Sequence, residues 1–137
     1  MLPVKRLRKN ARVPTRANPW DAGLDLYSVE RVTVSPGEIK AVSTGIAVAI
    51  PKGFVGIIKD RSSRALKGLH VLAGVIDPGY RDEVKVVITN LSRSPVTIEE
   101  GERFAQMLIV PVAYLEPKEV EELPPSDGRS GGFGSTG

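Results

Sequence analysis

Short stretches in which apolar and polar residues alternate dominate this chain and predict β-strands. Apolar side chains recur at every second position, as expected for strands with one buried face. Turns rich in glycine and proline separate these stretches, such as Ser35-Pro36-Gly37 and Pro51-Lys52-Gly53. The alternating positions are Val32 and Val34; Ile46, Val48 and Ile50; Val55 and Ile57; Val84, Val86 and Ile88; and Val96 and Ile98. Short strands at a spacing of about ten residues predict an all-β jelly roll or barrel.

Two segments break this alternation. The stretch from Arg103 to Val110 carries apolar residues on both faces, so we expect a strand that is buried on both sides. The stretch from Ser63 to Lys67 is the one plausible helix, and Gly68 fits the C-cap position that ends it. The expected elements therefore form one all-β domain with a single short helix.

The segment Asp77-Pro78-Gly79-Tyr80 predicts a tight turn. Proline at the second position and glycine at the third are typical of a type II turn. The segments Leu69–Val75 and Arg81–Ile88 would then be the two arms of a hairpin. Asp77 has two interpretations, as a turn residue that bonds local amides or as a general base. Tyr80 is either a stacking platform or an ordinary surface aromatic.

The last part of the chain differs in composition from the rest. It is acidic at first, then contains Pro124-Pro125, and has five glycines between Gly128 and Gly137. We therefore predict that residues 1–115 form the β-domain and that residues 116–137 form a mobile arm. The arm carries Arg129, Phe133 and three hydroxyl residues, Ser130, Ser135 and Thr136. Glycine backbone, hydroxyls and arginine are groups that bind phosphates, so a functional arm and a plain flexible terminus both stay open.

Composition narrows the classes of function. The 137 residues contain no cysteine and one histidine, which excludes a disulfide framework, a thiolate zinc site and a multi-histidine metal site within one chain. No apolar run is long enough to span a membrane and no signal peptide is evident, so a cytoplasmic protein is expected. The net charge is only +3, so nucleic acid is not required as a partner. The N-terminal basic residues (Lys5, Arg6, Arg8, Lys9, Arg12 and Arg16) are either a nucleic-acid arm or a solvated face.

Polar residues at three further places are candidates for binding or structure. Arg61, Ser62 and Ser63 precede the predicted helix, where exposed amides and hydroxyls bind an anion or the serines simply cap the helix. Asp25 lies in an apolar stretch and is either a hydrogen-bond hub or an outer-shell metal group. Gln106 is the only glutamine and lies in an apolar strand, where its amide needs partners.

The single histidine, His70, has the simplest interpretation of the candidate residues. It is expected to be a structural residue whose ring nitrogens are hydrogen-bonded.

Five motifs, taken together in order and spacing, resemble those of the trimeric dUTP diphosphatases (dUTPases). They are Ala22–Leu26 (AGLDL), Arg61–Gly68 (RSSRALKG), Gly74–Arg81 (GVIDPGYR), Gly101–Gln106 (GERFAQ) and Arg129–Gly137 (RSGGFGSTG). The resemblance runs from about residue 20 to the last residue. It implies a β jelly roll of the dUTPase β-clip type that forms a homotrimer with three shared active sites. Each site would take motifs one, two and four from one subunit, motif three from a second and the tail from a third.

The resemblance also implies the reaction. A dUTPase hydrolyses dUTP to dUMP and pyrophosphate by attack of water on the α-phosphorus, which keeps uracil out of DNA and supplies dUMP for thymidylate synthesis. Asp77 would be the catalytic residue that orients and deprotonates the water. Mg²⁺ would be held by the three phosphates and water, with Asp25 contacting its water shell.

The other motif residues would bind the substrate. The resemblance assigns the uracil to main-chain groups of the hairpin and to Lys85, and it places Tyr80 under the deoxyribose. Phosphate contacts would come from motifs two and four, with Phe133 stacking over uracil and the rest of the tail closing on the phosphates. The substrate-binding residues implied are Arg61, Ser62, Ser63, Gly74, Val75, Ile76, Tyr80, Lys85, Gln106, Arg129, Phe133, Gly134, Ser135 and Thr136.

One residue departs from the family pattern. Asp82 occupies the position after Tyr80-Arg81 where the family usually has glycine. Aspartate tolerates the left-handed conformation better than most residues, so only the local shape of the hairpin is in question.

Two other functions were weighed against the dUTPase. A dCTP deaminase shares the fold and part of motif two, but the glycine-rich tail with Phe133 and the short chain argue against it. A non-enzymatic β-barrel that binds nucleic acid or protein has only the basic N-terminus in its favour.

Overall fold

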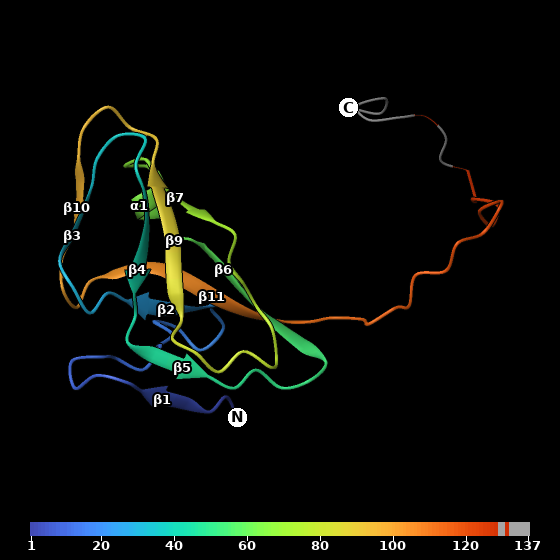
Figure 1. The fold of residues 1–137 in the computed structure, drawn as a ribbon, viewed down its shortest axis with the longest axis horizontal. Helices are drawn as coiled ribbons and strands as arrows, with labels where there is room; N and C mark the ends of the chain where they lie inside the picture. Colours follow the sequence, from blue (N-terminus) through green and yellow to red (C-terminus); the bar gives the residue numbers. More distant parts are fainter. Residues whose placement is uncertain (129–130, 132–137) are drawn as a thin grey trace.

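The computed structural model of the chain describes residues 1–128 and residue 131. Nearly all of its regular structure is β-strand, and the paired strands run antiparallel (Figure 1). The strands are β1 (Val4–Arg6), β2 (Gly23–Tyr27), β3 (Val32–Val34), β4 (Ile39–Ser43), β5 (Ile46–Val48), β6 (Phe54–Asp60), β7 (Leu69–Leu72), β8 (Val75–Ile76), β9 (Lys85–Asn90), β10 (Val96–Ile98) and β11 (Arg103–Pro111). One short helix, α1 (Ser62–Ala65), lies between β6 and β7. The predicted all-β, jelly-roll-like fold is confirmed.

Four sheets build the body of the molecule. The largest has the strand order β2-β11-β6-β8, and a second has the order β4-β9-β7. Two ribbons, β1-β5 and β10-β3, complete the body. β11 lies in the middle of the largest sheet, and its residues from Phe104 to Val110 are buried or half-buried on both faces, as expected.

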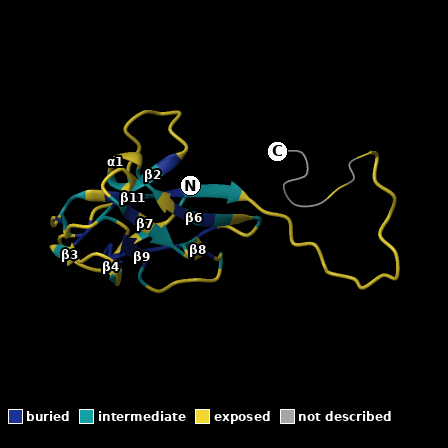
Figure 2. Cartoon of the chain, turned by 90° about the horizontal axis from the view of Figure 1, so that it is seen from above, coloured by how far each residue is buried: buried dark blue, intermediate teal, exposed yellow. Residues whose placement is uncertain are grey.

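The core is made of the alternating aliphatic residues that the sequence pattern singled out. Val84, Val86 and Ile88 are at most 1% exposed, and Val34 and Ile98 are fully buried. Such side chains each stabilise the fold by about 1.5–3 kcal/mol when they leave water. Figure 2 shows the buried segments gathered within the body, with exposed loops at its ends.

The helix is confirmed, but both expected caps are wrong. α1 begins at Ser62, one residue earlier than predicted, and its C-cap is Leu66 rather than Gly68, which follows two residues later with a φ of +102°. Arg61 occupies the N-cap position with an extended backbone, and no side chain caps the helix. The hydroxyls of Ser62 and Ser63 are therefore not used in capping.

The predicted hairpin is correct only in its outer part. β7 and β9 pair from Leu69 opposite Asn90 to Leu72 opposite Val87. The chain then turns sharply at Ala73 and Gly74, with φ values of +60° and +101°, and β8 pairs with β6 instead. A left-handed conformation costs an alanine about 1–2 kcal/mol, so the surrounding contacts must hold this corner.

The turn after β8 exists, but its type differs from the prediction. The Tyr80 N–H donates to the Asp77 carbonyl at 3.1 Å, which closes a four-residue turn. Type II is wrong, because it needs a positive φ at Gly79 and Gly79 does not have one. Asp82 also lacks a positive φ, so aspartate in place of the family's glycine is not strained.

After β11 the chain leaves the body (Figures 1 and 2). The Val112 N–H donates to the Gly53 carbonyl, and the Gly53 N–H donates to the Tyr114 hydroxyl, both at 2.9 Å. Residues 115–128 contain neither helix nor strand and are exposed. Leu115 and Leu123 are 85% and 83% exposed, so within one chain these apolar side chains stay in water.

The N-terminal basic segment belongs partly to the body. Lys5 and Arg6 lie in β1, which pairs with β5, and the basic side chains of this region face solvent. The structure therefore agrees with a solvated basic face rather than a free arm. In the part of the chain that the structure describes, no helix could cross a membrane, since α1 has only four residues.

Candidate active site

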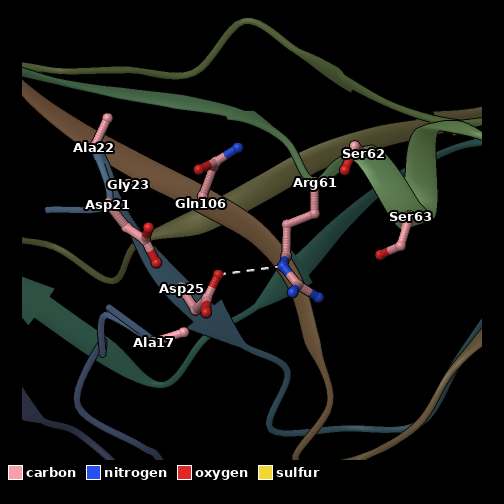
Figure 3. Close-up of a pocket in the computed structure, with 9 residues that line it drawn as sticks. All are labelled: Ala17, Asp21, Ala22, Gly23, Asp25, Arg61, Ser62, Ser63 and Gln106. Atoms are coloured by element: carbon pink, nitrogen blue, oxygen red, sulfur yellow. Dashed lines mark ion pairs between the residues drawn. The ribbon is translucent and has the colours of Figure 1, made fainter. Parts of the chain in front are cut away.

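A cavity of about 310 Å³ opens where β2, β11 and the junction of β6 with α1 meet (Figure 3). Its lining residues are Ala17, Asp21, Ala22, Gly23, Asp25, Arg61, Ser62, Ser63 and Gln106. The cavity therefore unites predicted residues from the first, second and fourth motifs. These motifs lie far apart in the sequence, so their meeting is a result of the fold.

The register of the largest sheet explains this meeting. Gln106 on β11 lies opposite Asp25 on β2, and residues that lie opposite each other point to the same face of a sheet. On the other side of β11, Ala105 lies opposite Asp60, the last residue of β6. Arg61 follows directly and enters the cavity beside Asp25 (Figure 3).

Asp25 is held by two arginines. Its Oδ1 lies 3.2 Å from Arg61 Nε, and its Oδ2 lies 3.4 Å from an Arg103 guanidinium nitrogen. The Asp25 side chain is only 14% exposed, and a carboxylate at this depth needs such partners. The hub interpretation of Asp25 is confirmed, and the Arg61 guanidinium is held at the edge of the cavity.

Among the described residues, the hydroxyls of Ser62 and Ser63 have no hydrogen-bond partner, and both lie at the cavity. Both residues are exposed, and both line the cavity. Because neither caps α1, both hydroxyls can donate to an anion in the cavity. Together with Arg61 they form a set of donors suited to phosphate oxygens.

Gln106 is fixed by the backbone around it. Its Nε2 donates to the Asp60 carbonyl at 2.7 Å, which satisfies the predicted need for a partner. A Cβ added to Gly23 would lie 2.1 Å from Gln106 Oε1 and 3.0 Å from its Cβ. Glycine at position 23 thus leaves room for this amide.

The Gly23→Ala substitution is expected to displace Gln106 and break its bond to Asp60. Loss of this hydrogen bond and the added crowding should lower the free energy of unfolding by about 1 kcal/mol. Chemical denaturation measures this change. Gly79→Ala is the matched control, because Gly79 has open space around it and no positive φ. Equal stability of the two variants would contradict this account of Gly23.

Arg64 anchors α1 to the start of β11. Its guanidinium pairs with Glu102, and its side chain is only 14% exposed. Burial, and secondarily the nearby Arg61, lower the pKa of Arg64. Sequence reasoning missed this pair, and also missed Asp21 and Arg103 as neighbours of Asp25. Arg103 lies within the fourth motif, which could have revealed it, whereas no sequence signal distinguishes Asp21.

The third motif lies outside this cavity. Asp77 and Tyr80 do not line the cavity, while Pro78 and Gly79 line a separate one of about 450 Å³ with N-terminal residues such as Met1 and Pro3. Within the described residues the Asp77 carboxylate is exposed and accepts no hydrogen bond. The local-amide interpretation of Asp77 is therefore wrong, because the Tyr80 N–H bonds its main-chain carbonyl instead.

The hairpin residues expected to contact a base lie at a sheet edge. β8 is the last strand of its sheet, so one edge of Val75 and Ile76 pairs with β6 and the other is unpaired among the described strands. The Gly74 carbonyl accepts from the Ile58 N–H at 2.8 Å, so that group is already used. The Tyr80 hydroxyl donates to the Glu83 carbonyl at 2.7 Å, which fixes its ring, and Lys85 is exposed.

The predicted tail residues lie outside the residues that the structure describes. They are Arg129, Phe133, Gly134, Ser135 and Thr136.

Metal binding by the protein alone is not supported by the carboxylates present. Among residues 1–128, no group of three or more histidine, aspartate or glutamate side chains gathers as a metal site. The cavity holds two carboxylates, Asp21 and Asp25, and Asp25 is already paired with arginines. This set fits a metal that contacts the protein through water rather than directly.

Comparisons with known proteins agree with this geometry. A family model described as dUTPase matches residues 9–137. The chain is 49% identical over 138 residues to the deoxyuridine 5'-triphosphate nucleotidohydrolase of Hydrogenobaculum sp. (strain Y04AAS1), covering 98% of this chain and 96% of that protein.

Solved structures are similar over nearly the whole chain. A mutant dUTPase of Staphylococcus bacteriophage 80alpha with dUpNHpp has a TM-score of 0.91 and 35% identity, covering 100% of this chain and 98% of that one. A mutant dUTPase from phage phi11 of S. aureus, described for its coordination of a structural Mg(II) ion, has a TM-score of 0.86 and 32% identity. That match covers 91% of this chain and 99% of the phage chain.

Proposed function

The chain belongs to the dUTPase family and hydrolyses dUTP to dUMP and pyrophosphate, and we propose that Asp77 activates the attacking water in this reaction. The observation that carries the proposal is the state of Asp77, an exposed carboxylate without a hydrogen-bond donor among the described residues. A carboxylate in this state is free to accept a proton from water. The attack is on the α-phosphorus, so the products are dUMP and pyrophosphate.

The cavity of Figure 3 takes the triphosphate in this proposal. Arg61 supplies a fixed positive charge, Ser62 and Ser63 donate from their hydroxyls, and Gln106 donates from its amide. Positioning and charge neutralisation provide most of the catalysis in phosphoryl transfer, which matches a cavity rich in donors. The pairing of Asp25 with Arg61 and Arg103 supports this role, because it holds the Arg61 guanidinium in place.

The hairpin takes the nucleoside. The unpaired edge of β8 offers main-chain groups of Val75 and Ile76 to the uracil, and Gly74, just before β8, and Lys85, at the start of β9, are the further contacts. Tyr80 packs under the deoxyribose and leaves no room for a 2′-hydroxyl. The Tyr80 hydroxyl bond to Glu83 supports this role, since it keeps the ring from rotating away.

The active site is shared between three subunits of a homotrimer in this proposal. The support is that one chain keeps Asp77 out of the cavity that holds Arg61, Asp25 and Gln106. A second copy would bring its own hairpin to that cavity. The exposed apolar residues Leu115 and Leu123 also suit an arm that packs on another copy.

The division into a β-domain (residues 1–115) and an arm (116–137) belongs to the same proposal. In the arm, Phe133 stacks over uracil, and Arg129, Gly134, Ser135 and Thr136 close on the phosphates. This assignment rests on the match of the family model, which extends to residue 137.

Mg²⁺ is the proposed cofactor. It would arrive bound to the phosphates and would neutralise their charge, and Asp25, with Asp21 beside it, would contact its water shell. The carboxylate set of the cavity supports contact through water, and a related phage dUTPase coordinates a structural Mg(II) ion.

A panel of nucleotides tests the proposed function. The protein should release pyrophosphate from dUTP, more rapidly with Mg²⁺ than with a chelator, and should act on dTTP, dCTP and UTP about 100-fold less efficiently or worse. Pyrophosphate release under matched conditions measures each rate. Release of ammonia from dCTP, or equal turnover of UTP and dUTP, would contradict the assignment.

A mixing experiment tests the shared site. Asp77→Asn and Arg61→Gln should each be nearly inactive, but hetero-trimers refolded from equal amounts should regain activity. If the two residues come from different chains, about one quarter of the sites in random trimers are intact. Refolded mixtures of wild type with the double variant are the control. No gain over the two single variants would show that each site lies within one chain.

A further inference from the structure

Asp60 contacts three different partners at the end of β6. Its Oδ2 lies 2.8 Å from His70 Nδ1, and its Oδ1 accepts from the Val71 N–H at 2.6 Å. Its main-chain carbonyl accepts from Gln106 Nε2 at 2.7 Å. The Asp60 side chain thus joins β6 to β7, and the Asp60 backbone joins β6 to the side-chain amide of Gln106 on β11.

The position of Asp60 in the chain makes these contacts important for the cavity. Asp60 directly precedes Arg61, and its carbonyl orients Gln106, so both proposed phosphate ligands depend on its backbone. The Asp60 side chain is 24% exposed and the His70 side chain 47% exposed. Hydrogen bonds that involve a carboxylate are short and directional, and two of them fix the rotation of this residue.

We propose that Asp60 and His70 form a positioning pair for binding the triphosphate. His70 and the Val71 N–H hold the Asp60 carboxylate on β7, and the Asp60 backbone then holds Arg61 and Gln106 at the cavity. Neither Asp60 nor His70 touches the substrate. The inference rests on the proposed phosphate role of Arg61 and Gln106, and it gives the single histidine of the chain a part in that role.

Because His70 lies in β7, the pair also connects to the strand that follows β7. β7 continues through Ala73 and Gly74 into β8, the strand proposed to read the uracil. The pair therefore ties the phosphate-binding end of β6 to the strand that leads into the hairpin. Loss of the pair should disturb phosphate binding before uracil binding. Arg61 is joined to Asp60 by a peptide bond, and Gln106 is joined to it by one hydrogen bond.

Steady-state kinetics on full-length protein test the pair. Asp60→Asn and His70→Leu should each raise the KM for dUTP about tenfold, the effect of losing one charge-assisted hydrogen bond, with kcat changed less than about twofold. His70→Asn should recover most of the loss, because its amide nitrogen can occupy the place of Nδ1. Arg93→Gln, at an exposed residue of the loop between β9 and β10, is the control. Unchanged KM in both variants, or no recovery with His70→Asn, would overturn the proposal.

The single histidine allows a second test that needs no variant. Its imidazole Cε1–H gives one NMR signal, which needs no assignment among several histidines. Adding dUpNHpp to the wild type should shift this signal, whereas deoxyuridine, which lacks phosphates, should not. A signal that stays in place with dUpNHpp would overturn the proposal even if the variants fail to fold.

Failure of the proposed function is a separate result. A wild-type protein that does not hydrolyse dUTP contradicts the function itself. Normal hydrolysis with an unmoved histidine signal contradicts only the positioning pair.

Discussion

The Asp77→Asn variant is expected to turn over dUTP about 1,000-fold more slowly than the wild type, the usual scale for loss of a general base. Asparagine keeps the size of the side chain but cannot take a proton from water. The KM should change little, because the proposed phosphate and uracil contacts come from other residues. The fold should also be unaffected, since the Asp77 carboxylate accepts no hydrogen bond among the described residues.

The matched control for this variant is Asp82→Asn. Asp82 is another exposed aspartate of the same loop, and its backbone has no unusual conformation. Initial rates of pyrophosphate release compare the two, and their melting temperatures show that both are folded. Near-normal turnover by folded Asp77→Asn protein would remove Asp77 as the base.

The strands could be predicted because alternation of apolar and polar residues over a few positions indicates a strand with one buried face. Val84, Val86 and Ile88 alternate in the sequence and are all buried in the structure. The partner of each strand could not be predicted in the same way. β8 leaves the hairpin to pair with β6 because Ala73 adopts a positive φ, and nothing about alanine indicates this.

The site residues of motifs one, two and four were predictable, and the structure brings them together in one cavity. Their interactions were not predictable, because they depend on which residues meet across strands. Capping by serine, for example, is a local preference, and here Arg61 takes the N-cap position. Similarly, the pairs Asp60–His70 and Arg64–Glu102 join residues from different elements. They meet only because of how the strands are aligned, which the sequence does not show.

Removing residues 127–137, so that the chain ends at Ser126, is expected to lower kcat/KM for dUTP by about 100-fold or more. In the proposed function this segment supplies Phe133 to the uracil and Arg129 with several hydroxyls to the phosphates. Loss of these contacts leaves the reacting groups less well positioned and open to water.

The truncated chain should still fold and assemble as the full chain does. The described core residues all precede Val110, and residues 115–128 are exposed in the single chain, so the truncation leaves this core complete.

Rates of pyrophosphate release, melting temperature and mass in solution are the three measurements. Lys118→Ala, in the retained part of the arm, is the control for a general effect of changing this region. Activity within about twofold of the full chain would contradict the proposed role of the tail, because one charge-assisted contact to phosphate alone is worth more than that. If the truncated chain loses both activity and assembly, these residues are part of the subunit contact instead. Loss of activity with an unchanged mass in solution supports a tail that completes the active site.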